Sequence, residues 1–203
     1  PVASKALAFN SDADGLTTVG SSALTLIKTI DLTSAASTIT FLNGTSDVVL
    51  DNTYPLYRFV FFNIHPASHN ADAAGGFNFN VAKTSTAFTA YHAEDDAASG
   101  VGYNVSNDAA QVTAAIPLSG QIYTDNDNSC SGFLDLYNPS STTFTKSFMS
   151  TNARTDYSVR PYQNQYHVAG YINTTSAVTG VQFSMWSGNI DDGTIKLYGI
   201  KDS

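Results

Sequence analysis

Histidine and aspartate are the side chains in this sequence best suited to bind a metal or to move a proton. His65 and His69 have the H-x3-H spacing that places two metal ligands on one face of a helix. Pro66 follows the first of them directly and the surrounding residues favour turns, so a helix is not expected there. His92 and His167 fall in stretches predicted as strands. We therefore expect hydrogen-bonded or surface histidines and no metal site.

An acidic segment, Asp125-Asn126-Asp127-Asn128-Ser129, resembles the beginning of a calcium-binding loop, with oxygen donors at alternate positions. The resemblance then fails. Position six would be Cys130, where the loop needs glycine, and position twelve would be Leu136, where it needs glutamate. The sequence therefore predicts an acidic turn between strands.

Two pairs of neighbouring carboxylates, Asp95-Asp96 and Asp191-Asp192, are candidates for acid–base catalysis. Neighbours on a strand face opposite ways, so neither pair is expected to converge on one substrate. Asp192-Gly193 is predicted instead to form the turn of the terminal hairpin.

Sequence signatures of catalysis are missing: there is no G-x-S-x-G elbow, no phosphate-binding glycine loop and no zinc signature. Cys130 is the only cysteine, which excludes an intrachain disulfide and favours a partly buried free thiol over a nucleophile or an intermolecular disulfide. We predict no catalytic residue, no cofactor and no bound metal, and thus a protein that is not an enzyme.

One aromatic and polar stretch is a candidate contact for a glycan or a protein partner. It runs from Tyr157 to Tyr166 in a context that favours a loop, and it also contains Arg160 and Tyr162. Tyrosine rings stack on sugars or pack at interfaces while their hydroxyls stay hydrated. The alternative is ordinary packing at the edge of a sandwich.

Composition determines the fold class and excludes several partners. The 203 residues contain 9 Lys and Arg against 17 Asp and Glu, a net charge of −8, and Glu94 is the only glutamate. Ser, Thr, Asn and Asp carry most of the polarity and disfavour helices. A basic patch for nucleic acid and an apolar run long enough for a membrane span are both missing. The chain begins at Pro1 rather than Met, which predicts that a segment was removed.

Short stretches with the two-residue period of β-strands recur from Leu24 onward. In Leu24–Leu32, the even-numbered leucines and Ile30 are expected on one face of the strand. Leu56–Ile64 is apolar on both faces of its strand, so both faces should be covered by other parts of the protein. Phe77–Val81 should have one wet face, formed by its asparagines. Further strands are expected at 38–42, 89–93, 112–118, 132–137, 144–149, 166–172, 180–186 and 194–201.

These strands predict an all-β protein: an antiparallel two-sheet β-sandwich of the jelly-roll type formed by residues 21–203. Pro117 and Pro139 should lie at strand ends or edges, because proline cannot donate to a ladder. Residues 1–20 are predicted to be an arm or linker. Its apolar residues Leu7, Phe9 and Leu16 are candidates for docking onto a partner.

Several strand and turn segments resemble virion proteins of marine tailed bacteriophages. The resemblance extends from about residue 24 to the end and is carried by the segments DNTYPLYRFVFFNIHPA (51–67), GFLDLYNPSST (132–142), GYIN (170–173) and VQFSMWSGNIDDGTIKLYGIK (181–201). It implies a non-enzymatic structural protein on the tail, fibre or capsid surface, with no catalytic residues to transfer. Such domains commonly assemble around a rotational axis.

The sequence therefore predicts a virion-located homo-oligomer, with a trimer favoured, that contacts other virion proteins and takes part in host attachment. The alternative is a carbohydrate-binding, lectin-like module that reads a host-surface glycan. A third possibility, a β-sandwich hydrolase acting on polysaccharide, would need acids that converge in a groove.

Overall fold

The described part of the chain is built from β-strands joined by turns and loops. The computed structural model describes residues 7–9, 16–18, 23–68, 76–81, 88–96, 109–112, 115–157 and 161–201. Its strands are β1 (Leu7–Phe9), β2 (Leu16–Thr18), β3 (Leu24–Asp31), β4 (Ile39–Leu42), β5 (Leu56–Pro66), β6 (Phe77–Val81), β7 (Phe88–Asp96), β8 (Ala109–Val112), β9 (Ile116–Pro117), β10 (Cys130–Tyr137), β11 (Lys146–Tyr157), β12 (Pro161–Ile172), β13 (Gly180–Met185) and β14 (Ile190–Ile200).

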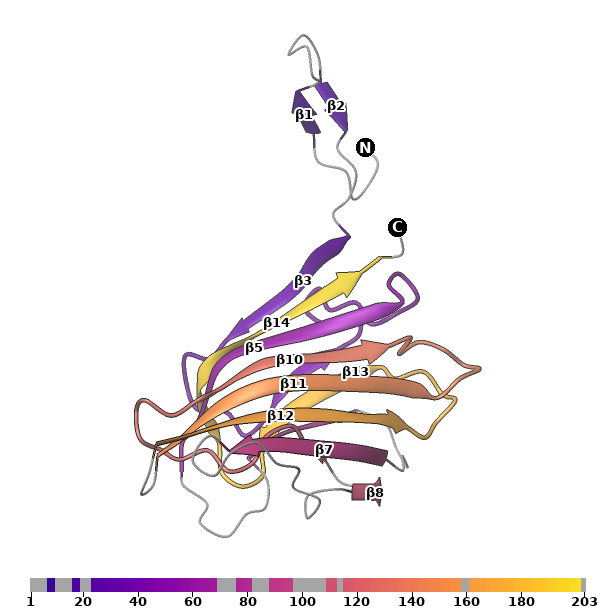
Figure 1. Ribbon diagram of the computed structural model, residues 1–203. Coiled ribbons are helices and arrows are strands. Elements are labelled where there is room, and N and C mark those ends of the chain that lie inside the picture. The colour runs from indigo at the N-terminus through magenta and orange to yellow at the C-terminus, as the bar shows by residue number, and fades with distance from the viewer. Residues whose placement is uncertain are drawn as a thin grey trace.

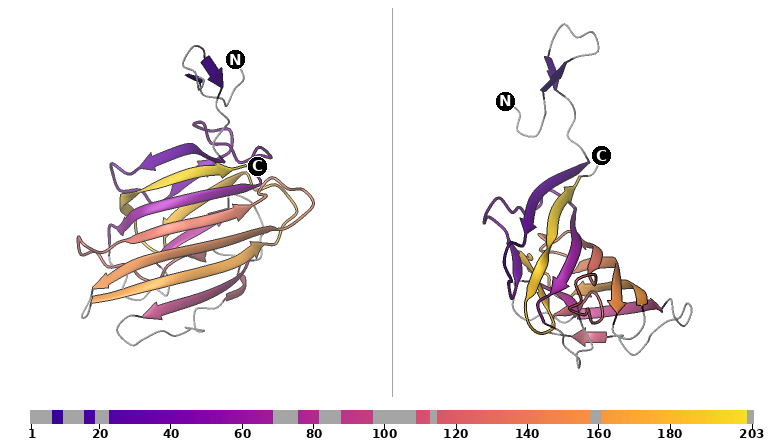
Figure 2. Two further views of the ribbon diagram at one scale, coloured as in Figure 1. Left: turned by 45° about the horizontal axis from the view of Figure 1, so that its top comes forward. Right: turned by 90° about the vertical axis from the view of Figure 1, so that its left-hand side faces the viewer.

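Two antiparallel sheets pack face to face, which confirms the predicted all-β sandwich (Figure 1 and Figure 2). The larger sheet has the order β3-β14-β5-β10-β11-β12-β7-β8, and the smaller has the order β4-β13-β6-β9. Eight of these strands pair in a nested way: β3 with β14, β4 with β13, β5 with β10, and β6 with β9. This is the pairing of one long hairpin folded over so that its two arms run through both sheets.

Two insertions into this nested set widen the larger sheet. β7 and β8 follow β6, and β11 and β12 follow β10; together they continue the larger sheet beyond β10. At the other end of the chain, β1 and β2 pair with each other in a separate two-stranded sheet, which stands away from the sandwich in Figures 1 and 2. The arm predicted for residues 1–20 thus contains a short hairpin.

The core lies between the facing sheets and is rich in phenylalanine. Phe183 on β13 lies 5.4 Å from Phe59 on β5 and 6.2 Å from Phe41 on β4, both in edge-on geometry. It also stacks on Phe77 of β6, with ring centroids 5.5 Å apart. All four rings are fully buried. Edge-on and offset pairs are the favourable aromatic geometries, so this cluster joins the two sheets at their centre.

β13 has the two-residue period expected of strand 180–186, because Val181, Phe183 and Met185 are buried and the side chains between them are half-buried. Pro117 ends β9 at the edge of the smaller sheet, and Pro139 lies just beyond β10, as expected.

Two other strand predictions are wrong in part. In β3, Leu24 and Leu26 are 46% and 52% exposed, because a register shift between Leu197 and Tyr198 leaves Ile27 as an extra residue and reverses the faces. Asn78, predicted to face water, is buried and donates to the carbonyl of Gly76.

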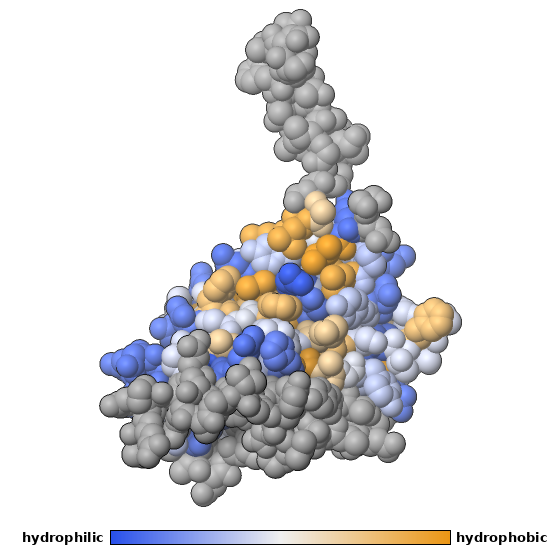
Figure 3. Space-filling view, in the orientation of Figure 1, coloured by the Kyte–Doolittle hydropathy of each residue, from blue (hydrophilic) through white to orange (hydrophobic). Residues whose placement is uncertain are grey.

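None of the described residues forms a second layer over the outer face of β5, contrary to the prediction from its apolar run. Arg58 on this face forms two 2.7 Å bonds with Asp135 of β10 and stacks on Phe133. Phe62 remains 42% exposed. Figure 3 shows this face, with apolar surface gathered over β3, β14 and β5.

The predicted terminal hairpin is wrong, because β13 pairs with β4 and β6 in the smaller sheet, whereas β14 pairs with β3 and β5 in the larger sheet. Residues 186–189, with Gly188 at φ = +80°, connect the two sheets, and Asp192-Gly193 lies inside β14. Gly193 has φ = +129°, a conformation that glycine adopts readily and that here accompanies two register shifts against β5. The dipeptide therefore marks a bulge rather than a turn.

Candidate functional site

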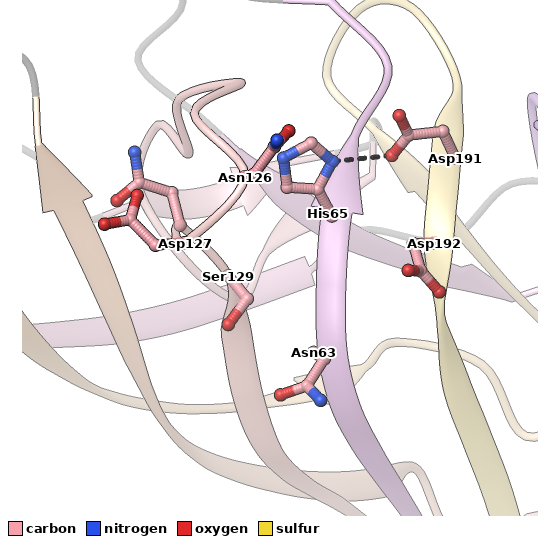
Figure 4. Close-up of a pocket in the computed structure, with 8 residues that line it drawn as sticks. Asn63, His65, Asn126, Asp127, Ser129, Asp191 and Asp192 are labelled. Carbon is pink, nitrogen blue, oxygen red and sulfur yellow. Dashed lines mark hydrogen bonds and ion pairs between the residues drawn. The ribbon is translucent and has the colours of Figure 1, made fainter.

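A polar pocket of about 590 Å³ opens where β5 ends, β14 begins and the 125–129 loop leads into β10 (Figure 4). Three segments that are distant in sequence form its wall. β5 contributes Asn63 and His65, β14 contributes Asp191 and Asp192, and the loop contributes residues 126–129. Its volume lies within the roughly 300–1,000 Å³ range of small-molecule sites.

Bulges in the two strands direct these side chains toward the pocket. The β5–β14 register shifts between Ile190 and Asp192 and again between Asp192 and Thr194. Asn63 sits in the left-handed region at φ = +50°, which asparagine tolerates better than most residues. Because the pleat is interrupted, the neighbours Asp191 and Asp192 both line the pocket. The expectation that neighbouring side chains face opposite ways is therefore wrong for Asp191 and Asp192.

His65 is held in place by hydrogen bonds to β14 and the loop. Its Nδ1 lies 2.6 Å from Asp191 Oδ1, and its Nε2 lies 3.4 Å from the carbonyl oxygen of Asp125. The side chain of His65 is 15% exposed and that of Asp191 is 38% exposed, so the pair lies at the pocket surface. The prediction of a hydrogen-bonded histidine is confirmed for His65.

The 125–129 loop is an acidic turn, as predicted, and β11 fixes its position. The backbone N–H of Asn128 donates to the carbonyl of Asp125 at 2.8 Å. Thr155 of β11 binds Ser129 twice: the Thr155 N–H donates to the Ser129 carbonyl, and the Ser129 N–H donates to the Thr155 hydroxyl, both at 3.0 Å. The loop is thus attached to the larger sheet.

The side-chain amide nitrogen of Asn128 has no hydrogen-bond partner, although the residue is only 2% exposed. A buried donor without an acceptor costs about 1–3 kcal/mol. Asn128 belongs to the pocket wall, but this nitrogen is shielded from solvent, so a ligand would reach it only if the loop shifted.

The pocket chemistry is that of a hydrogen-bonding site. Among the described residues that line it there are three carboxylates and no Lys or Arg, which disfavours an anionic ligand. No group of three or more His, Cys, Asp or Glu in the described part of the chain is arranged to hold a metal ion. His65 is bound to Asp191 and faces the Asp125 carbonyl, so neither ring nitrogen is directed at the Ser129 hydroxyl to activate it.

The described residues of the tyrosine stretch, Tyr157 and 161–166, lie in strands rather than in a loop. Tyr157 ends β11 and is paired with Pro161 of β12, and Tyr162 follows within β12. The side chains of Tyr157 and Tyr162 lie outside the described residues, as does all of Arg160. The stretch begins two residues beyond Thr155, which binds the pocket loop.

Tyr166 is not available as a glycan contact. It is 1% exposed, its hydroxyl accepts a 3.1 Å hydrogen bond from Arg154 Nε, and the Arg154 guanidinium lies 5.6 Å from its ring. This tyrosine belongs to the interior of the widened sheet. The backbones of Leu7, Phe9 and Leu16 lie in β1 and β2, but the side chains of these candidate arm contacts lie outside the described residues.

Cys130 is fully buried and bonds through its thiol to Asn152 Oδ1. Burial raises the pKa of this thiol from 9.0 to about 12. Burial likewise raises the pKa of Tyr57 from 10.0 to about 12. A thiol held in its neutral form in this way is not an activated nucleophile.

These raised pKa values predict a loss of stability at alkaline pH. Well below pH 9 both groups are neutral whether the chain is folded or unfolded, and their stabilisation of the folded state is complete. As pH rises toward 12 the unfolded chain ionises first, so the free energy of unfolding should fall. Urea unfolding at pH 8, 9.5 and 10.5 should show a shallower decline in Cys130→Ala than in wild type. Equal slopes would contradict this role for Cys130.

All three parts of the pocket stand out in the sequence, but each fails the motif that it resembles. His65 does not lie on a helix, as the H-x3-H motif requires, and the 125–129 loop has neither the glycine nor the glutamate of a calcium loop. Asp191 and Asp192 are neighbours in a strand, a position from which side chains normally face opposite ways. Asn63 was not predicted. The usable signal is Asp192-Gly193 within a strand-like run, because glycine inside a strand often marks a bulge that re-aims its neighbours.

Comparison with protein-family models, with curated proteins and with solved structures finds no match. Within the described residues there is also no helix that is both long and apolar enough to cross a membrane.

Proposed function

We propose that this chain is a non-enzymatic structural protein of a tailed-phage particle, displayed as a jelly-roll domain on the tail, fibre or capsid surface. The observation that carries the proposal is the nested pairing of eight strands across two sheets. A jelly roll is a double-sheet fold of eight strands, and it is common in viral capsid proteins.

The segments that resemble phage virion proteins support the same proposal, because they lie in the framework of this sandwich. Segment 51–67 contains β5, segment 132–142 contains most of β10, and segment 181–201 contains most of β13 and all of β14. β14, β5 and β10 are consecutive neighbours in the larger sheet. The resemblance therefore covers three neighbouring strands of the larger sheet, including the β5 and β14 residues that line the polar pocket.

Purified particles test this proposal directly. The chain should be found by mass spectrometry in particles that have been separated from lysate by density-gradient centrifugation, at a stoichiometry that matches a repeated position. Its absence from mature particles, while it is present in the same lysate, would refute the proposal.

The open edge and outer face of the larger sheet favour a homo-oligomer, for which we propose a trimer. β3 is an edge strand and carries Leu24 and Leu26, each about half exposed. Unpaired edges and exposed apolar side chains are commonly protected by burial against a neighbour. Residues 1–20 would attach the oligomer to other virion proteins.

We predict that the full chain is a trimer in light scattering and that a chain beginning at Ser21 loses incorporation into particles. The reason is that the arm supplies Leu7, Phe9 and Leu16 to a partner, and three arms act together. A monomer in both proteins, with the shortened chain still incorporated, would show the prediction to be wrong.

A second candidate function, recognition of a host-surface glycan, is favoured by one specific observation: the polar pocket between β5, β14 and the 125–129 loop. It is compatible with a structural role, because an attachment domain can be both part of the particle and a receptor reader.

A further inference from the structure

The pocket at the β5–β14 bulges has a wall made of hydrogen-bonding groups, and its ligand must match that wall. Asparagine, aspartate, serine and histidine side chains from β5, β14 and the 125–129 loop line it. Most small-molecule pockets are lined by apolar and aromatic side chains with a few polar groups. A ligand for this wall therefore needs many hydroxyl or amide groups and little apolar surface.

The charge of the wall restricts the ligand further. Asp127, Asp191 and Asp192 would repel a phosphate, a sulfate or an acidic sugar, and the described lining residues supply no Lys or Arg to offset them. Carboxylates accept hydrogen bonds from hydroxyl groups, and amide and hydroxyl side chains both donate and accept. A ligand rich in hydroxyls and without negative charge fits this combination.

The wall is also held in place before any ligand arrives. The His65–Asp191 hydrogen bond joins the two strands, and Asp192 Oδ1 accepts a 2.7 Å bond from the N–H of Gly193. Thr155 ties the loop side of the pocket to β11. Figure 4 shows Asp127 and Ser129 on the loop across from the strand pair that bears His65 and Asp192. A fixed wall reduces the ordering cost of binding.

We propose that this pocket binds a saccharide unit that carries no negative charge, through hydrogen bonds from its hydroxyls to the carboxylates, amides and hydroxyl of the wall. The inference rests on the second function proposed above and assigns it to the bulge pocket rather than to the tyrosine stretch. Binding occurs without cleavage of the glycan.

Saturation-transfer NMR on the full chain tests this assignment. The probes are methyl glycosides of glucose, galactose, mannose and N-acetylglucosamine, with methyl glucuronide as the acidic comparison. At least one uncharged glycoside should receive saturation, and the glucuronide should not. Titration of that glycoside then gives the affinity of each variant, and EDTA should leave it unchanged.

Variants locate the site. Asn126 and Asp127 are exposed loop residues, so Asn126→Ala and Asp127→Ala should fold normally and weaken binding roughly five- to tenfold or more. Asn52→Ala is the matched control: Asn52 is exposed in the loop before β5, at the end of that strand opposite the pocket. Its affinity should equal that of wild type.

Several outcomes would overturn the inference. If Tyr162→Ala lost affinity while both pocket variants bound as tightly as wild type, the glycan function would stand but the binding site would be the tyrosine stretch and not the pocket. The absence of transfer to every uncharged glycoside would refute both the pocket and the glycan function, and would leave the particle test unaffected. Preferred binding of the glucuronide, loss of binding in EDTA or release of new reducing ends from host glycans would each contradict the proposed chemistry.

Discussion

Replacing Phe183 by alanine should lower the free energy of unfolding by about 3–5 kcal/mol. The ring is fully buried at the centre of the sandwich and contacts Phe41, Phe59 and Phe77 from three other strands. Its removal opens a cavity that these rings cannot fill, because each is held by its own strand. Urea or guanidinium unfolding followed by fluorescence and circular dichroism measures the change.

Phe144→Ala is the control for this substitution. Phe144 is 71% exposed, so the same chemical change should alter stability by no more than about 0.5 kcal/mol. Both variants should have the same m-value, the slope of the free energy of unfolding against denaturant concentration, as wild type. A loss below about 1 kcal/mol in Phe183→Ala would mean that the two sheets do not pack around this ring.

The fold class was predictable because composition and two-residue periodicity act locally. The two-residue period of strand 180–186 followed from residues within a few positions, and β13 confirms it. The faces of β3 were not predictable. They depend on a bulge set by pairing with β14, which lies more than 160 positions away along the chain. A single extra residue reverses every side chain beyond it.

The candidate site was not predictable from the sequence for the same reason. The rule that strand neighbours face opposite ways holds for a regular pleat, and Asp191 and Asp192 lie where the pleat is interrupted. Likewise, a calcium loop is a self-contained motif, whereas the partners of the 125–129 loop are His65 and Thr155 on other strands. Motif rules that assume local geometry cannot recover a site assembled by long-range pairing.

Gly132→Ala should destabilise the protein by about 3 kcal/mol or more, because β10 and β11 approach closely at this residue. A β-carbon there would lie 2.3 Å from the Thr151 carbonyl oxygen and 2.6 Å from Asn152 Cα, both backbone atoms of β11. Neither strand can retreat, since β10 is also paired with β5, and β11 with β12. Overpacking against fixed backbone typically costs 1–3 kcal/mol and sometimes more.

Gly44 is the comparison for Gly132, because it is a glycine for its positive φ angle and not for lack of space. It has φ = +76°, and no atom lies within 4 Å of the position that a β-carbon would take, so Gly44→Ala should cost only the left-handed strain of about 1–2 kcal/mol. Asparagine tolerates that conformation, and Gly44→Asn should therefore recover part of the loss, whereas Gly132→Asn should be at least as damaging as Gly132→Ala. Thermal and denaturant unfolding of the four variants decides between the two causes. Wild-type stability in Gly132→Ala would show that the β10–β11 pair can separate without cost.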